Sequence, residues 1–280
     1  MNYKKEIDGL RAIAVLSVII YHLDIFIFGH KLFRGGFLGV DIFFVISGYL
    51  ITSIIIKDQN NNNFSLLNFY FRRAKRILPA YFFMTLITLI FSILIVSQSD
   101  LKEIIYSMFS STFFVSNFFF YFSSLEYGGL NGLLKPYLHT WTLSVEEQFY
   151  LFFPILFIFF NLKERNIFIY LIFFISFCFS NLAFKYYPNL NFYLIFSRAW
   201  ELFFGYIIYT NQNNIKKFFY KKKSKQVVSI ISFFLIIISL IIFYDEKLHP
   251  SIFTLLIIIP TGLLIIFARE NKIIQFFSQI

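Results

Sequence analysis

Residues 10–28 have the sequence LRAIAVLSVIIYHLDIFIF, an apolar run long enough to cross a bilayer as a helix. The run contains Arg11 and, eleven residues later, His22. Eleven residues on an α-helix span about 16 Å, and the two side chains lie nearly in line. Ionisable groups inside a membrane are costly and usually face a bundle interior or a wet cavity. We therefore treat the pair as a candidate functional site. The alternative is that Arg11 extends to the lipid headgroups and His22 is a satisfied interfacial histidine.

The whole chain has the composition of a membrane protein. Hydrophobic residues make up 58% of its 280 residues and charged residues only 14%, so apolar runs dominate. Runs of about twenty such residues recur, which predicts an all-α polytopic membrane protein in contact with the lipid bilayer. The net charge of +10 comes from basic residues beside these runs. The positive-inside rule explains that charge, and no nucleic-acid partner is expected. The single cysteine, Cys178, excludes an intramolecular disulfide, and we expect no metal.

Nine apolar segments are candidate spans, and we expect a helical bundle of about eight to nine transmembrane segments. They are 10–28, 36–56, 77–97, 102–122, 143–161, 166–184, 193–210, 227–244 and 251–269. We expect a single domain over residues 1–280. No cleavable signal peptide is expected, because the first run is too long and no small-residue cleavage site follows it.

Basic loops predict the orientation of these segments. Lys4 and Lys5 precede the first segment, a basic cluster at 72–76 precedes the third, and lysines crowd residues 216–225. The positive-inside rule places all three on the cytoplasmic side. Simple alternation through nine spans would instead place residues 216–225 outside.

The conflict disappears if residues 97–142 cross the membrane an even number of times. Either 102–122 spans and 123–142 re-enters, or 102–122 itself dips in and out. Glycines at 128, 129 and 132 fit irregular backbone at membrane depth. We therefore expect a re-entrant region. The alternative is that this region is a plain polar loop and that the list of nine spans contains one segment too many.

Two charged blocks come from the first third of the chain. Asp8 is placed to cap the helix of the first run. Asp41 lies inside an apolar run, where close helix packing would explain the neighbouring Gly39 and Gly48 but not the carboxylate.

Further charged blocks follow later in the chain. Arg73 and Arg76 are three residues apart on one helical face and could jointly hold a phosphate, although any basic cytoplasmic loop looks similar. Glu146 and its neighbour project to different sides of a helix, so at most one shares a pocket with His22. Arg198 lies three residues before a glutamate and fits an intrahelical ion pair best.

Taken together, these blocks resemble the bacterial acyltransferase 3 family of integral membrane acyltransferases. The stretches that carry the resemblance are Glu6–Ala12 with the Arg11–His22 pair, Gly35–Leu50, Arg72–Pro79, His139–Tyr150 and Arg198–Leu202, in that order. They cover nearly the whole chain.

The resemblance implies transfer of an acyl group, usually acetyl, from cytoplasmic acyl-CoA to a hydroxyl of a cell-surface carbohydrate. Lipopolysaccharide, capsule and peptidoglycan are such acceptors. It also implies a multi-pass protein of the bacterial inner membrane with a cytoplasmic N-terminus. The family's two functional motifs correspond to Arg11 with His22 and to Arg73 with Arg76. Because coenzyme A is a multiply charged anion, its phosphates should stay near the three arginines while its pantetheine arm extends toward His22.

The resemblance leaves two roles open for His22. It could deprotonate the acceptor hydroxyl as a general base, which we favour, or carry the acyl group itself. Glu146 or Asp24 would orient the imidazole. The remaining candidates for contact with substrate are Asp24, Asp41, Glu147, Arg198 and Glu201.

The family core normally continues for a further pair of helices, beginning with a Gly-x-x-Ser-Tyr-x-x-Tyr-Leu-Trp-His-type motif. This sequence ends where that motif is expected, which predicts a C-terminally incomplete domain. Two alternatives stay open: a transporter or flippase of a lipid-linked sugar or anion, and an inactive truncated family member. The lack of an internal repeat argues against many transporter folds.

Overall fold

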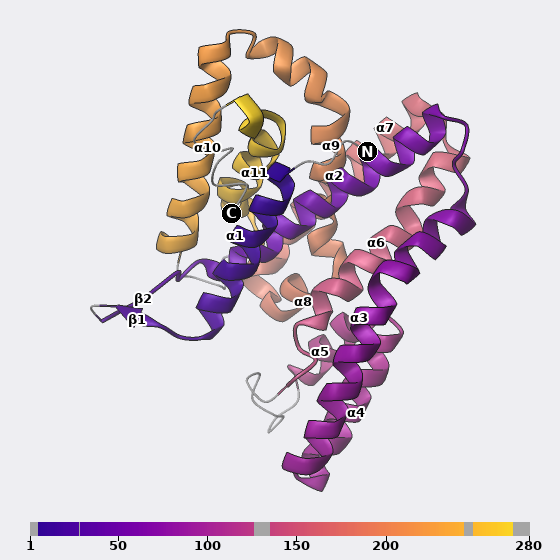
Figure 1. Cartoon of the computed structure of the whole chain (residues 1–280), viewed down its shortest axis with the longest axis vertical. Helices are drawn as coiled ribbons and strands as arrows, with labels where there is room; N and C mark the ends of the chain where they lie inside the picture. Colours follow the sequence, from indigo (N-terminus) through magenta and orange to yellow (C-terminus); the bar gives the residue numbers. More distant parts are fainter. Residues whose placement is uncertain (1–4, 28, 126–134, 244–248, 271–280) are drawn as a thin grey trace. The chain divides into compact units, whose positions relative to one another are not determined.

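The computed structural model describes residues 5–27, 29–125, 135–243 and 249–270, and these are mostly helical (Figure 1). By their internal contacts they divide into two compact units. Unit 1 consists of residues 1–54, 166–192 and 196–280, and unit 2 consists of residues 55–165 and 193–195.

Unit 1 holds the N-terminal and C-terminal helices. Its elements are α1 (Lys5–His22), η1 (Gly36–Leu38), α2 (Gly39–Asn60, as far as Ile54), α7 (Leu162–Tyr186, from Asn166), α8 (Pro188–Tyr193), α9 (Ile195–Phe218), α10 (Lys222–Ile242), η4 (Ile252–Thr254), α11 (Leu255–Phe267) and η5 (Ala268–Glu270). Between α1 and η1, the two-residue strands β1 (Phe26–Ile27) and β2 (His30–Lys31) pair antiparallel.

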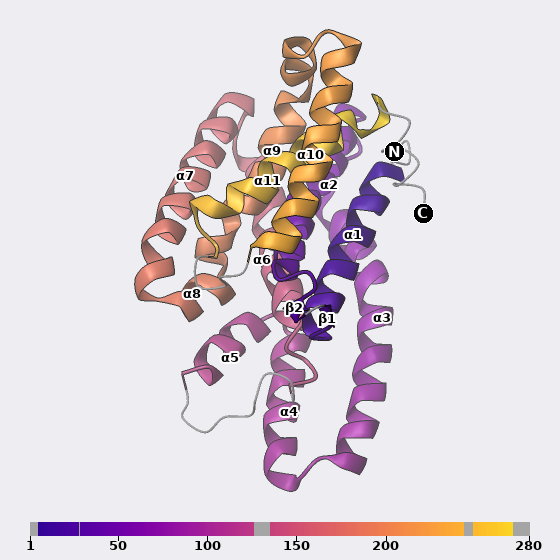
Figure 2. The same ribbon diagram turned by 90° about the vertical axis from the view of Figure 1, so that its left-hand side faces the viewer.

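Unit 2 holds the helices from the middle of the chain. They are α3 (Leu66–Ile95), α4 (Gln98–Thr112), α5 (Ser116–Ser123) and α6 (Thr140–Phe159). Ser65 caps α3 by accepting a hydrogen bond from the backbone N–H of Asn68. Helices α3 and α4 lie side by side, joined by a short turn (Figures 1 and 2).

The helices confirm an all-α polytopic membrane protein. Among the described residues, five helical segments are long and apolar enough to cross a membrane: Gly36–Asn60, Leu66–Ile95, Thr140–Phe159, Leu162–Tyr186 and Lys222–Ile242. Large apolar side chains are exposed along α3, among them Phe83 and Leu94, as expected for a surface that meets lipid. Three of the other predicted spans correspond to helices that carry more charges, α1 and α9, or that are shorter, α11.

The first predicted span, 10–28, is wrong at both ends. Helix α1 is already formed at Lys5, so Asp8 lies inside its first turns and does not cap it. The helix ends at His22 because Asp24 adopts a left-handed backbone (φ 49°) and the strands of the small hairpin follow. His22 therefore lies at a helix end and not deep within a span.

The prediction of one span over residues 102–122 is also wrong. Helix α4 ends at Thr112 and α5 begins at Ser116, with Phe114 between them in a left-handed conformation (φ 55°). This break leaves two helices that are each too short to span a bilayer. The glycines at 128, 129 and 132 lie outside the described residues, so the re-entrant region stays a prediction.

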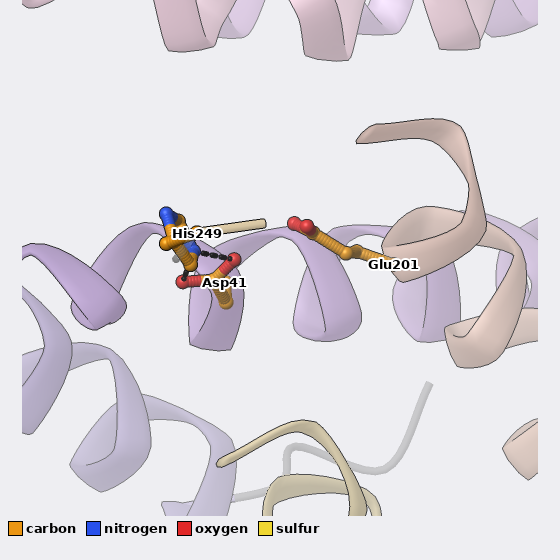
Figure 3. Close-up of side chains that lie close together, drawn as sticks. All are labelled: Asp41, Glu201 and His249. Carbon is orange, nitrogen blue, oxygen red and sulfur yellow. Dashed lines mark hydrogen bonds and ion pairs between the residues drawn. The ribbon is translucent and has the colours of Figure 1, made fainter. Parts of the chain in front are cut away.

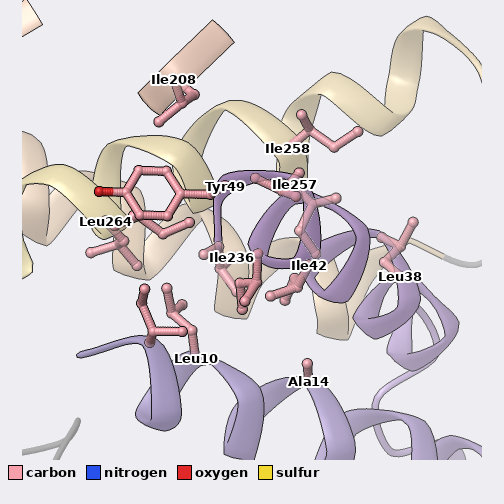
Figure 4. Packing of buried hydrophobic residues seen from close by; sticks show 14 of the residues in the cluster. Leu10, Ala14, Leu38, Ile42, Tyr49, Ile208, Ile236, Ile257, Ile258 and Leu264 are labelled. Atoms are coloured by element: carbon pink, nitrogen blue, oxygen red, sulfur yellow. The ribbon is translucent and has the colours of Figure 1, made fainter. Parts of the chain in front are cut away.

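The core of unit 1 is formed by apolar side chains from five helices (Figure 4). Leu10 and Ala14 of α1 face Ile42 of α2, and Ile236 of α10 and Ile257 of α11 complete the cluster. Each of the five is at most 4% exposed. The close packing of these side chains fixes the relative positions of helices that are far apart in sequence.

Helices α2 and α9 meet at a pair of glycines. A Cβ atom on Gly48 would lie 1.8 Å from the backbone oxygen of Leu202, and one on Gly205 would lie 2.4 Å from the backbone nitrogen of Tyr49. Both contacts are with backbone that cannot move aside. The predicted small-residue packing at Gly48 is thereby confirmed.

The start of α1 and the lysine-rich turn between α9 and α10 lie at the same end of unit 1. Glu6 of α1 forms an ion pair of 2.8 Å with Arg269 of η5. Phe219, in the turn, packs edge-on against Phe267 at the end of α11, with ring centroids 5.7 Å apart. The start of α1 and the turn therefore lie at one end of unit 1, and the side of the membrane on which they lie stays a prediction.

Gly48→Ala should lower the thermal midpoint of the detergent-solubilised protein. Forcing a methyl group against the Leu202 carbonyl should destabilise the fold by about 1–3 kcal/mol. Ala80→Val, which enlarges an exposed position on α3, is the matched control and should change the midpoint little. Equal midpoints for Gly48→Ala and the wild type would contradict the close approach of α2 and α9.

Candidate functional site

Arg11 and His22 lie at opposite ends of the apolar part of α1. The Arg11 guanidinium forms a partly exposed ion pair with Asp8, with Nη1 3.1 Å from Oδ1. The His22 imidazole is exposed and packs edge-on against Tyr21, with ring centroids 5.2 Å apart. The helix geometry keeps the two side chains close to one line, about 16 Å apart along the axis.

The hairpin that follows α1 brings a cation to this end of the helix. The ammonium of Lys31 lies 2.6 Å from the Asp24 carboxylate and 3.7 Å from the centroid of the Tyr21 ring. Lys31 did not emerge from the sequence as a candidate, because only the hairpin register places it beside residues 21–24. Asp24 thus has a cationic partner next to His22.

A buried cluster of charges joins α2, α9 and the segment before η4. Nη1 of Arg198 lies 3.1 Å from Oδ1 of Asp41 and 3.2 Å from Oε1 of Glu201. His249 binds the same Asp41, with Nε2 2.8 Å from Oδ2 (Figure 3). The Arg198, Asp41 and Glu201 side chains have no exposed surface. The predicted intrahelical pair of Arg198 and Glu201 is present, and it is part of a larger cluster.

His249 has Asp41 and Arg198 as its hydrogen-bond partners. Burial lowers the pKa of His249, because the charged imidazolium would lose its water. In the neutral ring, Nε2–H donates to the Asp41 carboxylate. Nδ1 is then the acceptor that faces Nη2 of Arg198 at 3.4 Å. Sequence reasoning missed His249, whose only signal is a histidine between the last two apolar runs.

Asp41, Glu201 and His249 also have the side-chain types of a metal site, and one potential ligand atom from each lies within 4.8 Å of the others. Arg198 is within hydrogen-bond distance of all three. Because arginine stays protonated in proteins, it supplies the positive charge that a metal ion would otherwise supply and would repel a second cation. The arrangement therefore favours a structural charge cluster over a metal site for Asp41, Glu201 and His249.

A second charged group lies in unit 2, between α3 and α6. Arg73 lies 4.0 Å from Glu147 (Nη2 to Oε1). Its guanidinium stacks 3.7 Å from the centroid of the Tyr150 ring. The Tyr150 hydroxyl in turn donates to Glu146 at 2.9 Å. Through Tyr150 and Arg73, Glu146 and Glu147 belong to one connected group, and whether either shares a pocket with His22 stays a prediction.

The candidate residues thus form separate groups. Arg73 faces α6, whereas Arg76, on the same helix, is exposed. In unit 1 the structure brings Asp41, Arg198 and Glu201 together. It gives Arg11 and Asp24 separate partners, Asp8 and Lys31.

The fold and these groups define a helical membrane protein with an ionisable pair on its first helix and an arginine–glutamate pair in unit 2. The family model described as "Acyltransferase domain" matches residues 4–280, through both units. The chain therefore belongs to the acyltransferase 3 family.

Curated relatives share part of this chain. The peptidoglycan O-acetyltransferase OatA of Listeria monocytogenes is 42% identical over 154 residues, which are 55% of this chain and 24% of that protein. The O-acetyltransferase OatA of Staphylococcus aureus is 40% identical over 169 residues, which are 59% of this chain and 27% of that protein. The chain thus spans about a quarter of the length of these relatives. No solved structure matches it.

Arg198→Met should strongly destabilise the protein. Removing the guanidinium leaves the Asp41 and Glu201 carboxylates buried without their cation, a loss of about 3–5 kcal/mol that a thermal melt in detergent would report.

The matched control for this variant is Arg72→Met. Arg72 forms an exposed ion pair with Asp58, and breaking such a pair should cost about 0–1 kcal/mol. Similar losses for the two variants would show that the buried cluster does not stabilise the fold.

Proposed function

We propose that this chain transfers an acetyl group from acetyl-CoA to a hydroxyl of a cell-wall carbohydrate, with His22 as the general base. The observation that carries the proposal is the exposed His22 imidazole at the end of α1, in line with Arg11 on the same helix. Membership of the acyltransferase family supports acyl transfer. The names of the relatives support acetyl as the group and peptidoglycan as the acceptor.

Acetyl-CoA is the proposed donor because its anionic phosphates and its uncharged pantetheine arm match the distribution of basic and apolar residues in this chain. The candidate groups for its phosphates are the guanidinium of Arg11 in unit 1 and, separately, those of Arg73 and Arg76 in unit 2, because guanidinium groups can form paired hydrogen bonds to phosphate oxygens. The uncharged pantetheine arm can leave the headgroup region, whereas the phosphates cannot. The rise of about 16 Å between Arg11 and His22 gives that arm a path along α1.

We further propose that the protein lies in a bacterial inner membrane with its N-terminus in the cytoplasm. The lysine-rich turn between α9 and α10 lies at the same end of unit 1 as the start of α1, and both carry the positive charge expected of cytoplasmic segments. His22 lies at the other end. Its neighbour Tyr21 contacts Phe37, which contacts Phe243 just beyond the far end of α10. The acetyl group would therefore cross from the donor side toward His22.

In the proposed reaction, the neutral His22 imidazole removes the proton of the acceptor hydroxyl. The hydroxyl oxygen attacks the thioester carbonyl, an ester C–O bond forms and the C–S bond breaks. The imidazolium then returns a proton to the departing CoA thiolate. Asp24, beside His22 and paired with Lys31, is the unit 1 residue suited to orient the imidazole; Glu146 keeps its predicted role as the alternative.

The residues predicted to contact substrate differ in whether a substrate can reach them. Asp41, Arg198 and Glu201 are fully buried and bonded to one another, which favours a structural role for them. Glu147 lines a cavity and stays a candidate for contact with substrate. The transporter alternative has no support from the family match.

Transfer of labelled acetyl from acetyl-CoA to cell-wall carbohydrate, in membranes that contain the chain, tests the proposal. His22→Ala should lower incorporation by about a hundredfold or more, the usual contribution of a general base. Leu23→Ala, at an exposed neighbouring position, is the control and should leave incorporation unchanged.

Two outcomes would contradict this proposal. Incorporation that His22→Ala leaves intact would exclude His22 as the base. Incorporation that proceeds without acetyl-CoA, or none from the wild type with peptidoglycan present, would exclude the proposed donor or acceptor.

A further inference from the structure

A buried arginine lies just beyond the turn that joins α6 to α7, in unit 2. Arg165 is 5% exposed, and its guanidinium stacks 4.0 Å from the centroid of the Phe157 ring. Within the described part of the chain, its Nε has no hydrogen-bond partner and its guanidinium forms no ion pair. Arginine stays charged in proteins, and a buried charge without a partner is costly. Arg165 therefore differs from Arg198, which has two carboxylates beside it.

The neighbouring carboxylate is engaged at the start of α7. Asn161 caps the helix by accepting a hydrogen bond from the backbone N–H of Glu164 at 3.0 Å. In return, the Glu164 carboxylate accepts from the backbone N–H of Asn161 at 3.3 Å. This reciprocal pair is a capping box, which holds the carboxylate at the helix start. Arg165 and the exposed Lys163 are left as the positive charges of the turn.

The turn lies at a surface of the membrane. Helices α6 and α7 are each long and apolar enough to cross a bilayer, so the residues that join them lie where one crossing ends and the next begins. Arg165 is four residues beyond Asn161, about 6 Å along the helix axis. Phe159 and Leu162, on either side of the turn, are 75% and 63% exposed, as expected for side chains that meet lipid. Arg165 thus lies at the depth where phospholipid headgroups meet the acyl chains.

A phosphate group is the anion that suits this position. Guanidinium groups bind phosphate oxygens through paired hydrogen bonds, and both a lipid headgroup and a soluble phosphate ester offer such oxygens. The exposed Phe159 and Leu162 favour the lipid, because acyl chains cover apolar side chains that a soluble anion would leave in water. Lys163 favours a lipid of net negative charge, because a zwitterionic headgroup would bring its own ammonium group to the turn.

We propose that the turn between α6 and α7 binds an anionic phospholipid, with Arg165 holding the headgroup phosphate and Lys163 adding to the attraction. The lipid supplies the partner that the described residues do not give to Arg165, and it ties the turn to the membrane surface. Neither residue takes part in the proposed reaction, so the inference is independent of the proposed function.

Native mass spectrometry of the delipidated chain in detergent tests the proposal with three probes: phosphatidylglycerol, phosphatidylcholine and coenzyme A, a soluble source of phosphate. The wild type should bind phosphatidylglycerol more tightly than phosphatidylcholine. Arg165→Met should weaken the first phosphatidylglycerol binding step by about tenfold to a hundredfold, the loss expected for hydrogen bonds to a charged group. Arg165→Lys keeps the charge without the planar fork and should recover part of the affinity.

Lys102→Met is the matched control. It also removes one positive charge, from an exposed position on α4, and should leave the first binding step unchanged. Thermal melts in detergent separate loss of the site from loss of the fold. Arg165→Met should keep a midpoint close to that of the wild type, because it removes a buried charge that has no ion-pair partner. Arg198→Met should not.

Four outcomes would contradict the inference. Phosphatidylglycerol binding that Arg165→Met leaves unchanged, or that Lys102→Met weakens equally, would overturn the site. Equal affinities of the wild type for the two lipids would overturn the preference for an anionic lipid. Coenzyme A binding that alone depends on Arg165 would assign the turn to a soluble phosphate. A midpoint for Arg165→Met as low as that of Arg198→Met would assign Arg165 to the fold.

Discussion

The buried interaction of Arg198 with Asp41 is the constraint on which unit 1 depends. The two residues are 157 positions apart in sequence, yet a guanidinium nitrogen and a carboxylate oxygen lie 3.1 Å apart without exposed surface. Glu201 and His249 complete the cluster, so α2, α9 and the segment leading to α11 are held at one point. An ion pair in such surroundings is stable only when each charge keeps its partner. The glycine contact between α2 and α9 brings the two backbones close enough for this.

This constraint separates structural charges from functional ones. Charged residues inside apolar runs are candidates for function by default, and the sequence offers several in this chain. Asp41, Arg198 and Glu201 bind one another, which accounts for their burial without a substrate. His22 lies exposed at the end of its helix. Arg73 and Glu147 are mostly buried, and each keeps one polar atom without a hydrogen-bond partner, as does Glu201 at Oε2. Burial and ion-pair partners therefore separate the candidates better than position in an apolar run does.

The sequence was sufficient to predict helices from apolar run length, family membership from ordered motifs, and the packing role of Gly48. It failed where local conformation overrides hydropathy. Phe114 and Asp24 adopt left-handed backbones that end helices inside apolar runs. Aspartate is enriched in this conformation but adopts others far more often, and phenylalanine gives no such signal. Contacts across long separations were equally hidden: His249 reaches Asp41 from 208 positions away. The cavity beside Arg73 was hidden too, because it depends on the packing of α3 against α6.

The proposed function requires that acetyl-CoA enters at the N-terminal end of α1 and that the acetyl group leaves at the His22 end. Membrane vesicles of known orientation, supplied with labelled acetyl-CoA on their outer face only, test this claim directly. Inverted vesicles, which expose the cytoplasmic face, should incorporate label into carbohydrate, and right-side-out vesicles should not. Incorporation in right-side-out vesicles alone, or equal incorporation in both, would contradict the claim.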